Sequence, residues 1–340
     1  MSSETNHPIQ KITLVGASGN LGRVLLSHLL NAATNNKKHN LQITILQRAS
    51  SKSVYPAGHH PHLTVRTVPD SWSLPDLTSA LRGQQAVIAA FPLRDLHSHL
   101  VLAEAAYACE TVVRFIPADY GSVDARSPLA RDLVPLFGKK VQVRELLEKL
   151  SKNSDGGRFS WTSLVNGHFF DWGLTNGFLH FYPFLDKGPR AHILGDGNAK
   201  SSQATLGQVA RAVVNILTGD REHLAKTRNR VLMLQSFLVS QNDVVDVLEK
   251  VTGRKWEREQ VDTQEYIRER KKVADQGGEG AAEAIEDLVF ALGVVEGDWT
   301  KKKEYSMELL GLEEEDLETV VRKALEESEE GKKLLAESGN

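Results

Sequence analysis

The most constraining feature of this sequence is a glycine-rich turn near its beginning. The segment Val15-Gly16-Ala17-Ser18-Gly19-Asn20-Leu21-Gly22 follows a short β-rich run, residues 11–15, and opens a stretch with helical spacing of leucines. Glycines at this spacing allow a tight strand-to-helix turn and a close approach of the backbone to a pyrophosphate. The helix N-terminus adds free N–H groups and about half a positive charge. We therefore expect a dinucleotide site formed by Gly16, Ser18, Gly19, Asn20, Leu21 and Gly22, with a plain tight turn as the alternative.

The rest of the first half alternates strand-like and helix-like segments. The run Ala86–Phe91 has no polar alternation, as expected of a strand buried on both faces. Such alternation of elements predicts a parallel sheet with helices on both faces, which is an α/β fold with a doubly wound, Rossmann-type sheet. Further strands are expected at residues 41–46, 62–68, 112–117 and 159–165, and helices at 93–109 and 130–150, among others.

The second half changes character after residue 165. Residues 166–190 are rich in aromatics and glycine, and the chain is mostly helical from about residue 241. This pattern indicates a smaller, mostly helical C-terminal substrate domain behind the sheet. We expect a flexible tail at 1–8, a Rossmann nucleotide-binding domain at 9–165 and a substrate-binding C-terminal region at 166–340, with 191–240 returning to the Rossmann sheet.

Composition and charge exclude several classes of protein. The 340 residues carry 41 Lys and Arg against 44 Asp and Glu, so nothing in the balance favours nucleic-acid or anionic-membrane binding. No segment approaches the roughly 20 apolar residues that a membrane span needs. Cys109 is the only cysteine, so no internal disulfide can form. We expect a cytoplasmic monomer or homodimer that binds a small molecule, without nucleic-acid or membrane partners.

The end of the second strand indicates which nucleotide is preferred. NAD-preferring sites usually place Asp or Glu there, on the ribose hydroxyls. This strand ends Gln47-Arg48-Ala49-Ser50-Ser51-Lys52, with no carboxylate. The Arg48 guanidinium can bracket a 2′-phosphate, and the Ser50 hydroxyl can add a donor. The sequence therefore predicts NADPH, with an exposed arginine at a loop start as the alternative.

A lysine falls on the apolar stripe of the helix expected at 130–150. At 100° per residue, Lys140 lies in line with Leu136, Val143 and Leu147, whereas Lys139 lies at the edge of that stripe. Desolvation lowers the pKa of a buried ammonium toward the range useful for proton transfer. Lys140 is therefore a candidate catalytic residue, and a lysine that reaches solvent or forms a structural ion pair is the alternative.

Other candidates follow the ends of strands, where open α/β sheets bind ligands. Phe91 and Pro92 are expected beneath the bridge between adenosine and nicotinamide, with a purely structural role as the alternative. Asp119 and Tyr120 are expected to touch cofactor or substrate, although Asp119 could equally cap the next element. Histidines at 59, 60, 62, 97 and 99 have no cysteine partner, so no metal site is expected.

Together these segments resemble the NmrA-like, isoflavone-reductase-like branch of the atypical short-chain dehydrogenases, and most closely a fungal subgroup. The resemblance extends from about residue 9 to 320 and is specific for fold and cofactor rather than substrate. Besides the glycine loop and the basic end of the second strand, it rests on Arg114-Phe-Ile-Pro-Ala-Asp-Tyr-Gly121, Lys140-x-x-Val143, Trp161-Thr-Ser-Leu-Val-Asn-Gly-His-Phe-Phe-Asp-Trp172 and Gly195-Asp-Gly-Asn198.

The resemblance implies an NADPH-dependent reductase that uses Lys140 in place of the usual Tyr-x-x-x-Lys pair, a spacing that none of the six tyrosines provides. It implies that Asn166 and His168 lie at the nicotinamide end. It also implies that the aromatics that follow line an apolar pocket. The substrate residues expected from these arguments are Asp119, Tyr120, His168, Phe169, Phe170 and Trp172. The sequence departs from the plant members beyond that loop, so a plant phenolic substrate is not implied.

The expected reaction moves a hydride to an electron-poor carbon of a small, largely apolar molecule of secondary metabolism. The substrate would be of the conjugated alkene, carbonyl or phenolic ether type. Lys140, with a water or His168, would supply or remove the proton. Two alternatives stay open: a dinucleotide-sensing regulator without turnover, and a redox-neutral isomerase or dehydratase.

Overall fold

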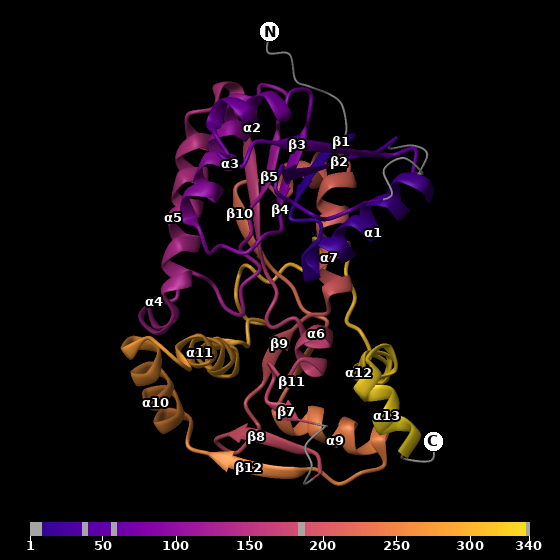
Figure 1. The fold of residues 1–340 in the computed structure, drawn as a ribbon, viewed down its shortest axis with the longest axis vertical. Helices are drawn as coiled ribbons and strands as arrows, with labels where there is room; N and C mark the ends of the chain where they lie inside the picture. Colours follow the sequence, from indigo (N-terminus) through magenta and orange to yellow (C-terminus); the bar gives the residue numbers. More distant parts are fainter. Residues whose placement is uncertain (1–8, 36–39, 56–59, 183–187, 338–340) are drawn as a thin grey trace.

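A parallel seven-stranded sheet organises the computed structural model, which describes residues 9–35, 40–55, 60–182 and 188–337 (Figure 1). The tail expected at 1–8 and the histidine at 59 lie outside these described residues. The strand order is β10-β6-β5-β4-β1-β2-β3, and every neighbouring pair is parallel. The strands are β1 (Lys11–Val15), β2 (Gln42–Arg48), β3 (Leu63–Val68), β4 (Ala86–Ala89), β5 (Arg114–Ile116), β6 (Ser160–Val165) and β10 (Arg230–Met233).

Helices cover both faces of this sheet, which confirms the predicted doubly wound fold (Figure 1). Alternate side chains of β4 show why: Ala86 and Ile88 pack into the core on one face, and Val87 and Ala89 into the core on the other. One face carries α2 (Leu74–Ala80), α3 (Leu96–Ala108) and α5 (Pro135–Lys152), and the other carries α1 (Asn20–Asn35) and α7 (Leu206–Thr218).

The helix expected at 130–150 is two helices, so that expectation is wrong at one point. α4 (Pro128–Leu133) ends before Val134, whose φ of −134° is extended, and α5 begins at Pro135. Proline has no backbone N–H and disfavours a helical conformation in the residue before it, but it is well suited to the first turn of a helix. The proline therefore sets the start of α5, the helix that carries Lys140.

The segment 191–240 is divided between the large sheet and the C-terminal region. α7 and β10 join the large sheet, whereas β8 (Arg190–Leu194) pairs with β7 (Phe181–Tyr182) and β12 (Glu257–Val261). A further antiparallel pair joins β9 (Ser201–Gln203) to β11 (Phe237–Val239). The remaining helical elements are α6 (Phe170–Thr175), α8 (Arg221–Lys226), α9 (Gln241–Thr252), α10 (Thr263–Gln276), α11 (Ala281–Glu296), α12 (Leu317–Glu327), α13 (Glu329–Glu337) and a 3₁₀ turn at Asp155–Gly157.

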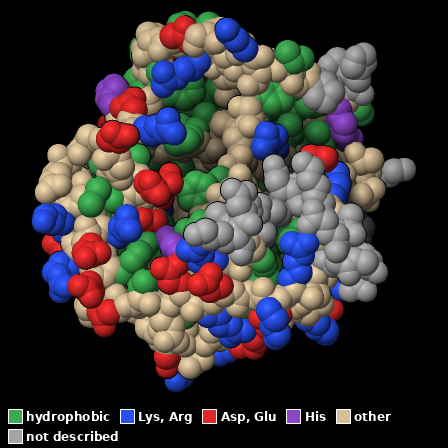
Figure 2. Space-filling model, turned by 60° about the horizontal axis from the view of Figure 1, so that its bottom comes forward, with side chains coloured by type: hydrophobic (Ala, Val, Ile, Leu, Met, Phe, Trp, Pro, Cys, Tyr) green, Lys and Arg blue, Asp and Glu red, His purple; other side chains and the backbone are tan. Residues whose placement is uncertain are grey.

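The surface of the C-terminal region carries charges of both signs. Figure 2 shows lysine and arginine interspersed with aspartate and glutamate on this face, with hydrophobic side chains recessed between them. Such mixing gives no extended field of one sign on the face shown. Among the described residues, no helix combines the length and the apolarity that crossing a membrane requires.

Two glycines explain the strand–turn–helix at the start of the chain. Gly16 has a φ of +88°, a conformation that glycine adopts without strain, and a Cβ there would lie 2.6 Å from the Ala90 carbonyl oxygen. A Cβ on Gly22 would lie 2.0 Å from the Gly16 carbonyl oxygen. The first turn of α1 can therefore pack directly on the loop only because position 22 has no side chain.

We predict opposite effects of alanine at two helical glycines. Gly22→Ala forces the loop away from α1 and should lower the free energy of unfolding by about 1–3 kcal/mol. Gly138→Ala, where a Cβ would meet nothing within 4 Å, should raise it by about 1 kcal/mol because alanine favours the helix. Urea titration of both variants measures this difference, and a Gly22→Ala variant as stable as the wild type would contradict the packing argument.

Candidate active site

The glycine loop presents an uncompensated helix N-terminus at the carboxyl edge of the sheet. Gly19 N donates to Gly16 O at 3.1 Å, and α1 begins at the next residue with no acidic side chain in its first turn. Ser18 and Asn20 are exposed beside it, whereas the Leu21 side chain packs into the core. The first-turn N–H groups and the positive end of the helix dipole are therefore arranged to accept an anion.

Arg48, at the end of β2, lies against the beginning of α3. Its Nη2 donates to Ser98 Oγ at 2.8 Å, and its guanidinium carbon lies 4.9 Å from the centre of the Trp72 ring. Asp95 in turn accepts a hydrogen bond of 2.5 Å from Ser98 Oγ. The guanidinium is thus held at the end of β2, and its other N–H groups form no hydrogen bond with the described residues.

The structure brings a carboxylate to this end of the site that sequence reasoning missed. Asp70 Oδ1 accepts from Ser50 N at 3.1 Å and from Ser50 Oγ at 2.7 Å. These hydrogen bonds, together with the Arg48 charge, hold the pKa of Asp70 below its ordinary value. Asp70 follows β3, and the pairing of Arg48 with Val68 is what places it beside Ser50. Nothing in the local sequence of the second strand signals this contact.

Phe91 and Pro92 follow β4 and border the centre of the site. The Phe91 ring stacks on His99 with 3.8 Å between ring centres and 15° between planes. His99 Nε2 lies 3.3 Å from the Pro92 carbonyl oxygen, and burial lowers the pKa of His99 to about 4, so the ring is neutral. In the described part of the chain no three His, Cys, Asp or Glu side chains are grouped to hold a metal.

Lys140 is a buried cation next to a small cavity. Its side chain is 8% exposed, and Nζ lies 5.0 Å from the centre of the Phe137 ring. Among the described residues, Nζ has no hydrogen bond and no ion pair. The cavity, of about 10 Å³, is lined by Leu93, His99, Pro117, Ala118, Asp119, Lys140, Val143 and Arg144.

Four residues after Lys140, a second buried cation forms ion pairs with two carboxylates. Arg144 Nε donates to Asp119 Oδ2, which also accepts from Ser163 Oγ on β6. Arg144 Nη1 donates to Asp124 Oδ1 at 2.5 Å. These contacts fasten the loop that follows β5 onto α5 and hold the Asp119 carboxylate in the cavity with Lys140. The sequence carried a signal for Arg144, because it shares the inward stripe of the helix with Lys140.

The surroundings of Lys140 change its acidity. Burial lowers the pKa of the ammonium to about 8; the nearby Asp119 carboxylate raises it and the Arg144 charge lowers it. A lysine with this pKa exists in both protonation states near neutral pH. Perturbed, unpaired titratable groups in a cavity are typical of functional sites.

Two loops at this edge of the sheet contain most of the site's unpartnered polar atoms. Buried side-chain atoms without a hydrogen-bond partner in the described part of the chain include Asp119 Oδ1, Tyr120 Oη, Ser122 Oγ, Asn166 Oδ1 and His168 Nδ1. The loops touch through Asn166 N, which donates to Gly121 O at 3.2 Å. Buried polar groups are costly unless a ligand or water pairs with them, so this cluster favours a polar ligand here.

His168 faces α11 and does not line the cavity at Lys140. Its Nε2 lies 3.2 Å from the Val289 carbonyl oxygen, and burial lowers its pKa to about 4. Because a carbonyl only accepts, the neutral ring must carry its proton on Nε2, which leaves Nδ1 as an acceptor. His168 therefore has no spare proton to donate in this arrangement.

The aromatic residues after His168 are placed differently from one another. Phe170 is fully buried, with its ring edge-to-face on Phe237 at 4.7 Å between centres. Phe169 and Trp172 are partly exposed, and Trp172 stacks on Phe178 at 4.5 Å. The Tyr120 side chain packs against the core near the glycine-loop side of the sheet. Residues 183–187 of the aromatic segment 166–190 lie outside the described residues.

Known proteins resemble this chain in sequence over most of its length. A family model described as the NmrA-like family matches residues 8–314. The oxidoreductase aprR of Aspergillus flavus is 34% identical over 259 residues, covering 76% of this chain and 79% of that protein. The oxidoreductase poxI of Penicillium oxalicum is 28% identical over 327 residues, covering 93% and 94%.

Solved structures share the fold at low identity. Pinoresinol-lariciresinol and phenylcoumaran benzylic ether reductases, described with their relationship to isoflavone reductases, match with a TM-score of 0.72 at 15% identity, covering 93% of this chain and 99% of the other. The leucoanthocyanidin reductase–NADPH complex of Vitis vinifera matches with a TM-score of 0.66 at 17% identity, covering 85% and 88%.

We predict that removing the Lys140 charge stabilises the fold in a pH-dependent way. Because the pKa falls from 10.5 to about 8 on folding, keeping this amine charged in the folded protein costs about 3 kcal/mol at pH 7. Between these two values the unfolded chain binds the proton more tightly, so wild-type stability rises with pH. Lys140→Met should therefore be more stable than wild type at pH 7, with the advantage shrinking toward pH 10.5.

Thermal unfolding at pH 7 and pH 10 measures this effect. Lys139→Met is the matched control, because Lys139 Nζ donates to the Arg94 carbonyl oxygen at the surface. An advantage of Lys140→Met that is equal at both pH values would contradict the burial of a charged amine.

Proposed function

We propose, from the premise that this chain belongs to the NmrA-like family and is an oxidoreductase of isoflavone-reductase-like type, that it reduces a small organic molecule with NADPH. The observation that carries the proposal is Lys140. It is a buried ammonium without a hydrogen bond to the described residues, beside a carboxylate, at the ligand-binding edge of the sheet. Such an arrangement costs stability and is suited to proton transfer.

The cofactor site we propose follows the carboxyl edge of the sheet. The pyrophosphate would lie on the N-terminus of α1, where Gly16, Gly19 and Gly22 keep the backbone free of side chains and the first turn carries no acid. Arg48 and Ser50 would bind the 2′-phosphate, Phe91 and Pro92 would lie beneath the bridge, and Lys140 and Asn166 would face the nicotinamide end. When bound, NADPH would supply a hydride for the substrate carbon.

Asp70 limits how strongly this site can prefer NADPH over NADH. Its carboxylate already holds both the N–H and the hydroxyl of Ser50, so a 2′-phosphate must compete for these donors. Arg48 therefore contributes most of the proposed discrimination against NADH, because its charge attracts the phosphate at short range.

The chain's own residues would handle the proton. Lys140 would deliver it to the substrate atom next to the reduced carbon, or to a carbonyl oxygen. The Arg144–Asp119 pair would hold the loop and the ammonium in place. The neutral His168, with its free Nδ1, would accept a hydrogen bond from a substrate hydroxyl rather than provide the proton.

The proposed substrate is largely apolar and carries a conjugated alkene, a carbonyl or a phenolic ether. Phe169 and Trp172 are partly exposed and would contact it, whereas Phe170 would support the pocket wall from the core. Asp119 and Tyr120 would contribute the polar side of the pocket. In this arrangement residues 9–165 with α7 and β10 form the nucleotide-binding domain, and most of the remainder to 340 forms the substrate domain.

The first prediction of the proposal concerns cofactor choice. Wild-type protein should bind NADPH more tightly than NADH in isothermal titration calorimetry. Arg48→Ala should weaken NADPH binding about 10- to 100-fold, because the charged guanidinium that would bind the 2′-phosphate is lost. The same substitution should change NADH binding about 2-fold at most. Equal affinity of the wild type for both nucleotides would contradict the assignment of NADPH.

The second prediction concerns turnover. With a panel of enones, ketones and benzylic ethers, wild-type protein should consume NADPH, measured by the loss of its absorbance. Lys140→Ala should slow the turnover by about 10²- to 10⁴-fold and leave NADPH affinity within about 3-fold. Lys139→Ala is the control and should keep its rate.

Two outcomes of this assay would count against the proposal. Retained turnover in Lys140→Ala would remove Lys140 from the mechanism. Tight NADPH binding without consumption of NADPH on any substrate of the panel, together with capture of a protein partner, would favour a regulator instead.

A further inference from the structure

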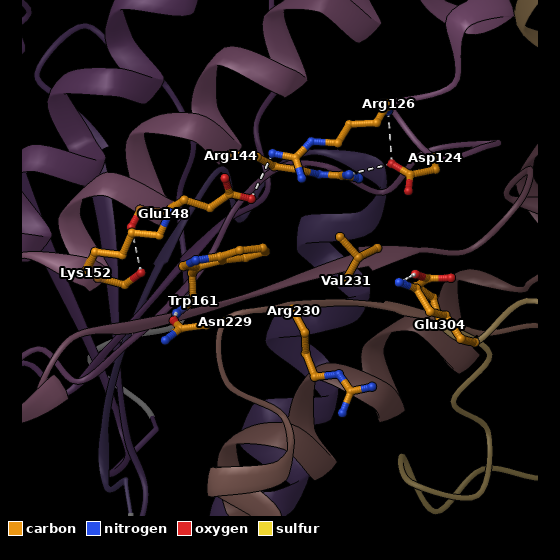
Figure 3. A pocket seen from close by; sticks show the side chains of 12 residues that line it. Asp124, Arg126, Arg144, Glu148, Lys152, Trp161, Asn229, Arg230, Val231 and Glu304 are labelled. Atoms are coloured by element: carbon orange, nitrogen blue, oxygen red, sulfur yellow. Dashed lines mark hydrogen bonds and ion pairs between the residues drawn. The ribbon is translucent and has the colours of Figure 1, made fainter.

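A groove of about 770 Å³ lies between α5 and the edge strand β10 (Figure 3), and none of the residues expected at the active site lines it. Its floor is formed by Trp161, near the start of β6, and Val231 of β10. One wall is the face of α5 that carries Arg144, Glu148 and Lys152, which are spaced four residues apart. The opposite wall is the segment at Lys303 and Glu304, which is tied to β10 where Met233 N donates to Glu304 O at 2.7 Å.

The charges of the groove are not balanced. Each of its three carboxylates has a cation from the same lining: Asp124 with Arg144 at 2.5 Å, Glu148 with Arg126 at 2.8 Å, and Glu304 with Lys303 at 3.6 Å. Two further cations, Lys152 and Arg230, have no acidic partner among the described residues. The groove therefore carries an excess of positive charge that favours an anion.

Two buried donors of the same lining also lack an acceptor. Trp161 is 3% exposed and its Nε1 has no hydrogen-bond partner among the described residues, and the same holds for Nη2 of Arg144, which is 1% exposed. Neither group can accept a hydrogen bond, so only an acceptor can satisfy them. A polar donor left unpaired in a buried position costs about 1–3 kcal/mol. Two unpaired donors therefore lie on residues that line the groove, together with the excess positive charge.

The floor adds apolar side chains to this lining. Figure 3 shows the Trp161 ring and the Val231 side chain between the α5 side chains and Arg230. A planar ring can lie on such a surface, and an inorganic ion would leave it uncovered. The volume also falls within the range of about 300–1,000 Å³ that is usual for small-molecule sites.

We propose that this groove binds a small aromatic carboxylate, with the carboxylate accepting from Trp161 Nε1 and Lys152 and the ring lying over Val231 toward Arg230. The groove shares Arg144 with the cavity at Lys140 and has no other side chain in common with it. The site is therefore distinct from the one proposed for catalysis, although Arg144 lies between the two.

Isothermal titration calorimetry of the full chain with 4-hydroxybenzoate tests this site. Binding should be saturable and at least about 10-fold tighter than that of inorganic phosphate, which lacks the ring, and of 4-hydroxybenzyl alcohol, which lacks the charge. The double variant Lys152→Gln/Arg230→Gln, at exposed positions that do not threaten the fold, should weaken binding by about 10-fold or more. Trp161→Phe, which keeps a ring and removes the donor, should weaken it by about 5- to 10-fold.

The matched control is Lys149→Gln, which removes an exposed charge from α5 outside the groove and should leave the affinity within about 2-fold. Three outcomes would overturn the proposal: no saturable binding of 4-hydroxybenzoate, equal binding by wild type and the double variant, or phosphate binding as tight as that of the aromatic acid. Equal binding by wild type and double variant would place the ligand elsewhere, including the proposed substrate site. None of these results bears on NADPH-dependent turnover, so each proposal can fail without the other.

Discussion

The buried Arg144 guanidinium is the interaction on which the candidate site depends. It joins α5 to the loop after β5 through Asp119 and Asp124, and Ser163 of β6 binds the same Asp119 oxygen. Burial by itself lowers the pKa of Arg144, but the two carboxylates outweigh this effect and raise it. A buried ion pair is tolerable when hydrogen bonds accompany it, as they do at Nε and Nη1 of Arg144. The loop position, and with it the cavity beside Lys140, follows from this contact.

Two cations on one helix therefore have different roles. Arg144 forms ion pairs with two carboxylates and fastens the loop after β5 to α5. Lys140, one turn earlier, is buried without a hydrogen bond or an ion pair to the described residues. The two carboxylates offset the free-energy cost of burying Arg144, whereas the cost of burying the Lys140 ammonium is only partly offset. A fold retains an uncompensated charge of this kind where its chemistry is needed, which is why Lys140 rather than His168 carries the proposed proton transfer.

The sequence was informative where the signal is local. The glycine loop, the strands buried on both faces and the inward position of Lys140 all follow from spacings of two or 3.6 residues. Pro135 is a local signal for the break before α5, although the apolar pattern of the helix continues across it. Asp70 beside Ser50, His99 under Phe91 and Asp119 on Arg144 were not readable, because each contact joins residues from elements whose distance in the chain gives no indication of their distance in space.

The sequence by itself determined that this chain forms a doubly wound α/β sheet with a glycine-rich strand-to-helix turn after its first strand and a lysine on an inward helical stripe. Backbone geometry imposes these features on any chain with the same local pattern. Only the tertiary structure decided that Lys140 lines a cavity together with a carboxylate held by Arg144, that Asp70 lies near Arg48, and that a charged groove lies next to β10. These three features depend on the strand order and on which side chains form hydrogen bonds and ion pairs across the fold. Local periodicity carries no information about either.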